Sequence, residues 1–197
     1  MGFDAAEEIT QQKWHVREEV RRRRAALTPA ERLRARDALT DHLVSLVRDR
    51  GAATVSCYVP LPDEPDTSGF LAWAASAGVE VLLPVSLPGR RLAWTRSGSP
   101  LIAGRHGILE PSGQQLPASV ASGLDLMLLP ACAVDLRGTR LGWGLGYFDR
   151  CLSELQRRPP LFAVVHEAEV LPALPGETHD IPVDGAVTPE AIRYFPR

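Results

Sequence analysis

Hydrophobic positions follow a helical spacing in the first quarter of the chain. Residues 11–27 form one helical segment, which carries four consecutive arginines from Arg21 to Arg24. A second segment begins with Thr28-Pro29-Ala30-Glu31, the pattern of a capping box with proline in the first helical position. It ends at Gly51, and its apolar residues share one face: Leu39, Leu43, Leu46 and Val47. The pattern thus predicts two N-terminal helices.

Short apolar runs alternate with helical or turn-rich segments in the rest of the chain. Strands are predicted at residues 53–59, 79–83, 91–95, 124–129, 161–165 and 186–187. Helices are predicted at 68–78, capped by Thr67 or Ser68, and at 147–156, with a capped turn at 188–190. Residues 96–123 are rich in Gly, Pro and Ser, which predicts little regular structure beyond a short turn.

This alternation predicts the fold class. Strands separated by helices require right-handed crossovers and a mainly parallel sheet. We expect a three-layer α/β fold, a mainly parallel sheet flanked by helices, with the N-terminal helices packed on one side. The 197 residues, of which 45% are hydrophobic, suit a single domain over residues 1–197.

The composition of the chain limits which binding partners and which cellular location we expect. The net charge of -2 gives no general reason to expect a nucleic acid or an anionic membrane as partner. No apolar run approaches the roughly 18 residues of a membrane span, and residues 1–14 lack the apolar core of a signal peptide. Cys57, Cys132 and Cys151 are odd in number and lack metal-ligand spacing, so they are predicted to be reduced and buried. The expected location is the cytoplasm.

The chemically most informative stretch lies at residues 135–150, between a predicted buried strand and a helix. Gly142, Gly144 and Gly146 let the backbone approach a ligand, and the amides of the next helix favour an anion. Arg140 adds a cation suited to phosphate. The chain contains no Walker A motif, and a tyrosine replaces the last glycine of a dinucleotide fingerprint. A phosphate site is therefore predicted, with a flexible glycine-rich connector as the alternative.

Residues 138–150, GTRLGWGLGYFDR, resemble the signature of the 5-formyltetrahydrofolate cyclo-ligase family, commonly G-x-R-L-G-x-G-x-G-Y-Y-D-R. The resemblance covers nearly the whole chain in the right order. Further segments similar to the family's pattern are Lys13 with Arg17, Val59 to Thr67, Gly107 to Pro111, and His179-Asp180 with Thr188.

The resemblance implies an enzyme that depends on ATP and Mg²⁺ and converts 5-formyltetrahydrofolate to 5,10-methenyltetrahydrofolate. In the family's mechanism ATP phosphorylates the formyl oxygen, N10 attacks the activated carbon, and ADP and phosphate are released. Such chemistry requires mainly positioning and charge neutralisation. The expected partner is a small folate, with or without a polyglutamate tail, and neither a nucleic acid nor a membrane. We expect a monomer or weak homodimer.

The resemblance also implies residue roles, with Arg140 and Tyr147 in catalysis. The nucleotide would be held by Lys13, Arg17, Arg140, Leu141, Gly142, Trp143, Gly144, Leu145, Gly146, Tyr147 and Phe148. The folate would be held by Val59, Glu64, Trp143, Gly144, Leu145, Gly146 and Tyr147. Magnesium would be held by Asp149 and Asp180, since Mg²⁺ prefers one or two carboxylates with phosphate oxygens.

Physical chemistry supports several of these roles. A helix places Lys13 and Arg17 on one face, because they are four residues apart. A carboxylate such as Glu64 can accept paired hydrogen bonds from an aminopyrimidine edge. The flat rings of Trp143 and Tyr147 suit a pterin face, although simple packing remains the alternative for Trp143. His179 is expected in a turn or hydrogen bond rather than as a ligand of a hard ion.

Two positions, Leu145 and Phe148, depart from the family's pattern, and a third, Asp135, agrees with it. Leu145 replaces a residue that is usually small or cationic, which adds bulk where phosphate would pass. Phe148 replaces the second tyrosine and lacks its hydroxyl. Asp135 is interpreted as a turn-former that holds the loop, with a polar catalytic contact as the alternative.

Two other functions are open. A catalytically weak member would bind folate or nucleotide without turnover, and Leu145 motivates this alternative. A nucleic-acid-binding module would use the arginine-rich first helix. Interleaved Glu18, Glu19, Glu31 and Asp37 favour a solvated face instead.

Overall fold

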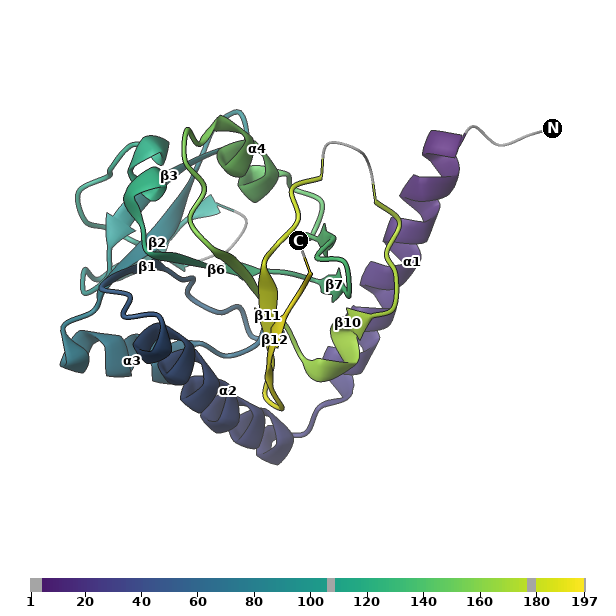
Figure 1. Ribbon diagram of the computed structural model, residues 1–197, viewed down its shortest axis with the longest axis horizontal. Coiled ribbons are helices and arrows are strands. Elements are labelled where there is room, and N and C mark those ends of the chain that lie inside the picture. The colour runs from purple at the N-terminus through teal and green to yellow at the C-terminus, as the bar shows by residue number, and fades with distance from the viewer. Residues whose placement is uncertain (1–4, 106–108, 177–179, 197) are drawn as a thin grey trace.

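A mainly parallel sheet forms the centre of the protein (Figure 1). The computed structural model describes residues 5–105, 109–176 and 180–196. The five inner strands pair in parallel, and the two outer strands are antiparallel to their neighbours. The order is β12 (Ile192–Tyr194), β11 (Gly185–Val187), β9 (Leu161–Val164), β6 (Leu126–Pro130), β1 (Thr54–Ser56), β2 (Glu80–Leu87) and β3 (Arg91–Arg96). The predicted α/β fold is confirmed.

Helices cover both faces of this sheet. One face carries α2 (Pro29–Asp49) and α3 (Ser68–Ala77), and the other carries α4 (Tyr147–Glu154) and the 3-10 helix η2 (Ala118–Gly123). A hydrophobic core lies on each face of the sheet. Alternate residues of β6 pack into one core or the other, because successive side chains of a strand point to opposite faces. Leu126 and Leu128 pack with α2, whereas Met127 and Leu129 pack with α4. This is why the strand is a continuous apolar run.

The helix starts agree only partly with the sequence. The predicted capping box of α2 is confirmed, because the amide of Glu31 donates to Thr28 Oγ1 at 3.3 Å and Glu31 accepts from the Thr28 amide at 2.8 Å. The predicted cap of α3 is wrong, since no side chain at Thr67 or Ser68 caps that helix. The Thr67 hydroxyl instead donates to the Tyr58 carbonyl at 2.7 Å.

Strands that the sequence did not predict lie in several regions of the chain. Within residues 96–123, β4 (Leu101–Ala103) and β5 (Leu109–Pro111) form an antiparallel ribbon, and η2 is the predicted short turn. Leu101, Ile102 and Leu109 are exposed, so no buried alternation marks this ribbon. The edge strand β12 was missed for the same reason, because its residues are half-buried or exposed.

A second, three-stranded sheet, which the sequence did not predict, contains the start of the glycine-rich segment. It consists of β10 (Val170–Leu171), β7 (Ala133–Asp135) and β8 (Arg140–Leu141). Helix α1 (Ala5–Ala26) packs against this sheet through Val16 and Val20, which contact a cluster around Ala133 and Leu141. The two N-terminal helices therefore do not share one side: α2 lies under the large sheet and α1 lies along the small one (Figure 1).

A buried ion pair holds α1 in place. The Arg24 guanidinium donates to the Glu169 carboxylate through Nε at 2.6 Å and Nη2 at 2.7 Å, with both side chains almost fully buried. Arg24 also donates to the carbonyls of Ala131 at 3.0 Å and Asp63 at 3.3 Å. Burial alone would lower the pKa of Arg24, but the hydrogen bond and charge of Glu169 raise it above its ordinary value. Glu169 belongs to the 3-10 helix η3 (Glu167–Glu169), so this pair links distant parts of the chain.

The three cysteines are free and buried, as the sequence predicts. Burial raises the pKa of Cys57 and Cys132 to about 12 and that of Cys151 to about 11. Their thiols therefore stay protonated near neutral pH and pack as small apolar groups. In the described part of the chain, no helix has the length and apolar character to cross a membrane.

Removing one partner of the buried pair tests its role. Glu169→Gln should lower the free energy of unfolding by about 3–5 kcal/mol, because it leaves the Arg24 charge buried without its counter-ion. Urea denaturation at pH 7 measures this. Glu19→Gln is the control, since Glu19 pairs with Arg23 at 2.8 Å on the surface and should cost less than about 1 kcal/mol. Equal losses in the two variants would contradict the role of the pair.

Candidate active site

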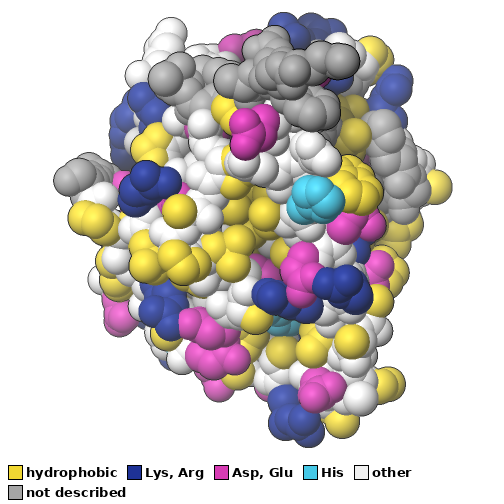
Figure 2. Space-filling view, turned by 90° about the vertical axis from the view of Figure 1, so that its right-hand side faces the viewer, with side chains coloured by type: hydrophobic (Ala, Val, Ile, Leu, Met, Phe, Trp, Pro, Cys, Tyr) yellow, Lys and Arg dark blue, Asp and Glu magenta, His cyan; other side chains and the backbone are white. Residues whose placement is uncertain are grey.

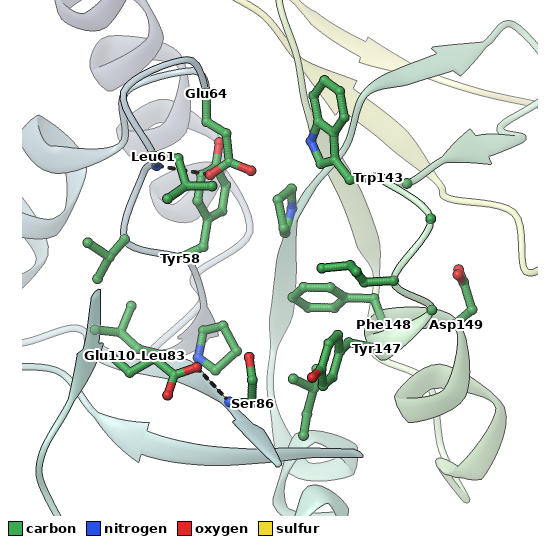
Figure 3. Close-up of a pocket in the computed structure, with 18 of the residues that line it drawn as sticks. Tyr58, Leu61, Glu64, Leu83, Ser86, Glu110, Trp143, Tyr147, Phe148 and Asp149 are labelled. Carbon is green, nitrogen blue, oxygen red and sulfur yellow. Dashed lines mark hydrogen bonds between the residues drawn. The ribbon is translucent and has the colours of Figure 1, made fainter. Parts of the chain in front are cut away.

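A pocket opens at the ends of the parallel strands β1 and β6 and along the second half of β2. Its volume is about 180 Å³, far more than the roughly 15 Å³ that one water requires. One wall carries Glu64 and Glu110, and the facing wall carries Trp143, Phe148 and Tyr147 (Figure 3). Ligands of open α/β sheets bind at this end of the strands.

The glycine-rich segment forms the second wall through an unusual backbone. Gly144 has φ +91° and Gly146 has φ +71°, conformations that side-chain-bearing residues rarely adopt. Gly146 directly precedes α4, so the first amides of that helix are left without helical partners. The predicted loop that leads into a helix is present, and it lines the pocket.

Asp135 organises the start of this segment. Its Oδ1 accepts from the amides of Arg137 and Thr139, both at 2.9 Å, and its Oδ2 accepts from the amide of Leu174 at 3.0 Å. Burial raises the pKa of Asp135, but these amide hydrogen bonds more than offset it and leave the pKa below its ordinary value. The interpretation of Asp135 as the turn-former is supported, and it does not line the pocket.

Helix α1 contributes two cations near the glycine-rich segment. The Arg17 Nε donates to the Gly142 carbonyl at 2.9 Å, which joins the helix to the glycine-rich backbone. Lys13 Nζ lies 3.8 Å from Asp180 Oδ2. Arg17 therefore contacts the backbone of the segment, and Lys13 contacts Asp180, without either side chain lining the pocket.

Arg140 is the buried cation of the site. It forms an ion pair with Asp149, and Asp180 also acts electrostatically on it. Burial lowers the pKa of Arg140, and the two aspartates only partly offset this, although an arginine remains protonated. Its Nε is buried without a hydrogen-bond partner among the described residues. The structure thus brings both predicted metal-binding aspartates close to this guanidinium.

The predicted aromatic residues line the pocket in different ways. Guanidinium groups of Arg21 and Arg24 each lie 5.2 Å from the Trp143 ring centre, and the Trp143 Nε1 is buried without a described partner. Phe148 packs edge-on against Trp94. Tyr147 faces the cavity across from Glu110 (Figure 3). The packing interpretation of Trp143 is therefore supported, while its edge remains part of the pocket wall.

Two carboxylates occupy the wall opposite the rings. The predicted residue Glu64 accepts a hydrogen bond from the Leu61 amide at 3.1 Å. Burial raises the pKa of Glu64, and that amide and the charge of Arg24 partly offset the rise. Glu110, 6% exposed, was not predicted as a site residue, although the segment Gly107 to Pro111 was recognised. That segment was the available indication, because it contains a carboxylate within a family-like pattern.

Most predicted site residues come together, with some exceptions. Val59, Glu64 and the residues from Gly142 to Asp149 line one pocket with Arg140. Leu141 does not line it, because its side chain is buried against α1. Leu145 is 42% exposed at the pocket wall. His179, like Gly107, lies outside the described residues.

The arginines of α1 are largely engaged within the protein. Arg21 pairs with Glu18, Arg22 and Arg23 pair with Glu19, and Arg24 is buried. Figure 2 shows basic and acidic side chains interspersed on the face seen there. A strip of one sign of charge, the usual feature of a nucleic-acid surface, is not seen on the described part of that face.

The fold and the pocket together define an α/β enzyme with a small-molecule site at the ends of its parallel strands. The glycine-rich segment with Arg140 adds the features of a phosphate site. The chain belongs to the 5-formyltetrahydrofolate cyclo-ligase family, whose model matches residues 9–189.

Individual proteins agree with this assignment. The 5-formyltetrahydrofolate cyclo-ligase of Mycolicibacterium smegmatis is 37% identical over 147 residues, covering 70% of this chain and 74% of that protein. The Escherichia coli K12 protein of the same name is 30% identical, covering 88% and 98%. The NMR structure of Aquifex aeolicus 5,10-methenyltetrahydrofolate synthetase matches with a TM-score of 0.79 and 30% identity, covering 94% and 93%.

The hydrogen bonds of Asp135 predict a specific pH dependence of stability. Because the folded state lowers the pKa, the contribution of the carboxylate is present above its ordinary pKa of about 3.9 and is lost as the pH falls through the lowered value. Asp135→Asn should cost about 1–3 kcal/mol at pH 7, since its amide nitrogen cannot accept from Leu174.

Urea denaturation between pH 7 and pH 3 measures the effect. The difference in unfolding free energy between wild type and Asp135→Asn should stay constant down to about pH 5 and shrink below about pH 4. Asp41→Asn, at an exposed position of α2, is the control. A difference that grows on acidification would refute this account of Asp135.

Proposed function

We propose that this protein converts 5-formyltetrahydrofolate to 5,10-methenyltetrahydrofolate with hydrolysis of ATP to ADP and phosphate. One observation carries the proposal. The glycine-rich segment lines the apolar pocket, with its carboxylates, and its backbone is also contacted by Arg17 of α1. A folate can lie in the pocket while the phosphates of ATP lie along the segment, so that the two reactants meet at it.

The nucleotide side provides positive charge and backbone donors. Lys13, Arg17 and Arg140 would contact the phosphates, and the first amides of α4 would donate to them. Phosphoryl transfer requires mainly such positioning and charge neutralisation. The Nε of Arg140, which has no described hydrogen-bond partner, would gain a phosphate oxygen as acceptor.

The aspartates fit a magnesium ion that is bound together with ATP. Asp149 and Asp180 both act on the guanidinium of Arg140, so their carboxylates are close enough to serve one bound nucleotide. Described residues form no cluster of three metal-ligating side chains, which agrees with an ion that completes its shell with phosphate oxygens and water. When bound, Mg²⁺ would neutralise phosphate charge, while Arg140 and Lys13 would turn from the aspartates to phosphate oxygens.

The pocket side would hold the folate. Glu64 would accept hydrogen bonds from the aminopyrimidine edge of the pterin. Tyr147 and the edge of Trp143 would bound the pterin from the facing wall. ATP then phosphorylates the formyl oxygen, the N10–carbon bond forms as N10 loses its proton, and the carbon–oxygen bond breaks to release phosphate.

The exposure of Leu145 bears on the alternative of a weak enzyme. Its side chain lies at the pocket wall and is 42% exposed, so part of it is directed to solvent. This favours turnover over binding alone. We further propose that the protein works in the cytoplasm, as a monomer or weak homodimer.

Turnover gives the direct test. Purified protein with ATP, Mg²⁺ and 5-formyltetrahydrofolate should generate the absorbance of the methenyl product. Asp149→Ala should lower the Mg²⁺-dependent rate by about a hundredfold or more, since removal of a transition-state charge contact costs about 3 kcal/mol. Glu154→Ala, at an exposed position five residues further along α4, should keep the wild-type rate.

Absence of product with any divalent ion would refute the activity. A wild-type rate in Asp149→Ala would instead refute the metal role.

The backbone of Gly144 should matter for nucleotide affinity. Gly144→Ala places a side chain at φ +91°, a conformation disfavoured by about 1–2 kcal/mol, so the loop should shift. Calorimetric titration with Mg²⁺ and a non-hydrolysable ATP analogue should show about tenfold weaker binding. Gly123→Ala is the matched control, because its new Cβ meets no atom within 4 Å and its φ is not positive. Equal affinity in both variants would contradict the role of this backbone.

A further inference from the structure

A buried carboxylate that has no cationic partner among the described residues lies in the pocket wall. Glu110 of β5 is 6% exposed, and its Oε1 accepts a hydrogen bond from the Ser86 amide at 2.8 Å (Figure 3). Among the residues that the structure describes, no lysine, arginine or histidine lies within 4.0 Å of this carboxylate. Gly104 packs against it, at a position where a side chain would collide with the carboxylate.

Such an arrangement is costly unless a ligand completes it. A carboxylate loses its hydration when it is buried, and proteins normally compensate with a cation or several hydrogen bonds. Glu169 has the guanidinium of Arg24, and Asp135 has three backbone amides. Glu110 has one neutral amide and faces the cavity. Because the described residues supply no counter-charge, we expect it from the molecule that occupies the pocket.

Glu64, the other carboxylate of that wall, is in a different electrostatic position. The buried guanidinium of Arg24 acts on Glu64 and favours its charged form. Glu64 therefore has a protein cation nearby and suits neutral donors such as those of an aminopyrimidine. The two carboxylates of one wall are thus suited to different parts of a ligand.

The proposed reaction generates a suitable cation. The formyl group of the substrate is a neutral amide on N5. After ring closure the same carbon is bonded to N5 and N10, and the three atoms share one positive charge. We propose that Glu110 is the counter-ion of this cation and a catalytic residue of the ring closure, an inference that rests on the proposed function.

The charge explains how Glu110 would accelerate the reaction. Positive charge grows on the carbon as phosphate departs with the electron pair of the carbon–oxygen bond. A carboxylate already fixed by the Ser86 amide, in a site sheltered from water, stabilises that charge without reorganisation. Because the substrate is neutral at this carbon, Glu110 would favour the transition state and product over the substrate, which raises the rate.

Binding measurements without ATP separate this role from a structural one. The affinity of the full chain is measured for 5-formyltetrahydrofolate and for 5,10-methenyltetrahydrofolate, immediately after mixing. Glu110→Gln should weaken binding of the methenyl cation by about tenfold to a hundredfold, because it removes one member of a buried charge pair. Binding of the neutral 5-formyl compound should stay within about twofold, since the glutamine still accepts from Ser86.

Two further variants serve as controls for the comparison of the two folates. Glu64→Gln should weaken both folates to a similar extent, because Glu64 would contact the shared pterin. Glu110→Asp keeps the charge and should keep the preference for the cation, which excludes a folding defect as the cause.

Equal weakening of both folates in Glu110→Gln, or undiminished binding of the cation, overturns the assignment. Failure of the wild-type protein to bind either folate overturns the proposed function itself. The two failures are distinguishable, because the first leaves wild-type binding intact.

Discussion

The buried pair of Arg24 and Glu169 is the interaction on which the site depends. Arg24 lies in the last turn of α1, and its guanidinium reaches η3, the Ala131 carbonyl after β6 and the Asp63 carbonyl before Glu64. One side chain thus joins α1 to both halves of the pocket. A buried pair of this kind adds little net stability but strongly disfavours any arrangement that separates the partners. It therefore fixes where α1 lies.

The position of α1 determines the composition of the site. With α1 docked on the small sheet, Arg17 reaches the Gly142 carbonyl and Lys13 reaches Asp180. Both aspartates of the proposed metal site then have a cation beside them, because Asp149 pairs with Arg140. These ion pairs compensate the charges of the two aspartates. They also keep the groups near the places where phosphate oxygens and a metal ion would engage them.

Much of the fold was predictable because local patterns and burial agree. The continuous apolar run of β6 reflects cores on both faces of the sheet, and the Thr28–Glu31 capping box is a purely local interaction. The sequence failed to predict elements whose main interaction is with residues outside the element, or whose side chains are too exposed to leave a hydrophobic pattern. The Thr67 hydroxyl bonds the Tyr58 carbonyl rather than its own helix. The ribbon of β4 and β5 is largely exposed, so its sequence carries no burial pattern.

The sequence by itself determined the fold class, the glycine-rich segment and the family, because each depends on residue types at short spacing. Only the tertiary structure decided which charges meet. Arg24 and Glu169 are 145 residues apart, and nothing local distinguishes Arg24 from the three arginines before it. Likewise, Glu110 became a site residue only when β5 placed it beside Ser86 in the pocket wall. The burial of a charged group and the partners it meets depend on how the chain packs. They determine how strongly the charges of Glu169 and Glu110 are stabilised.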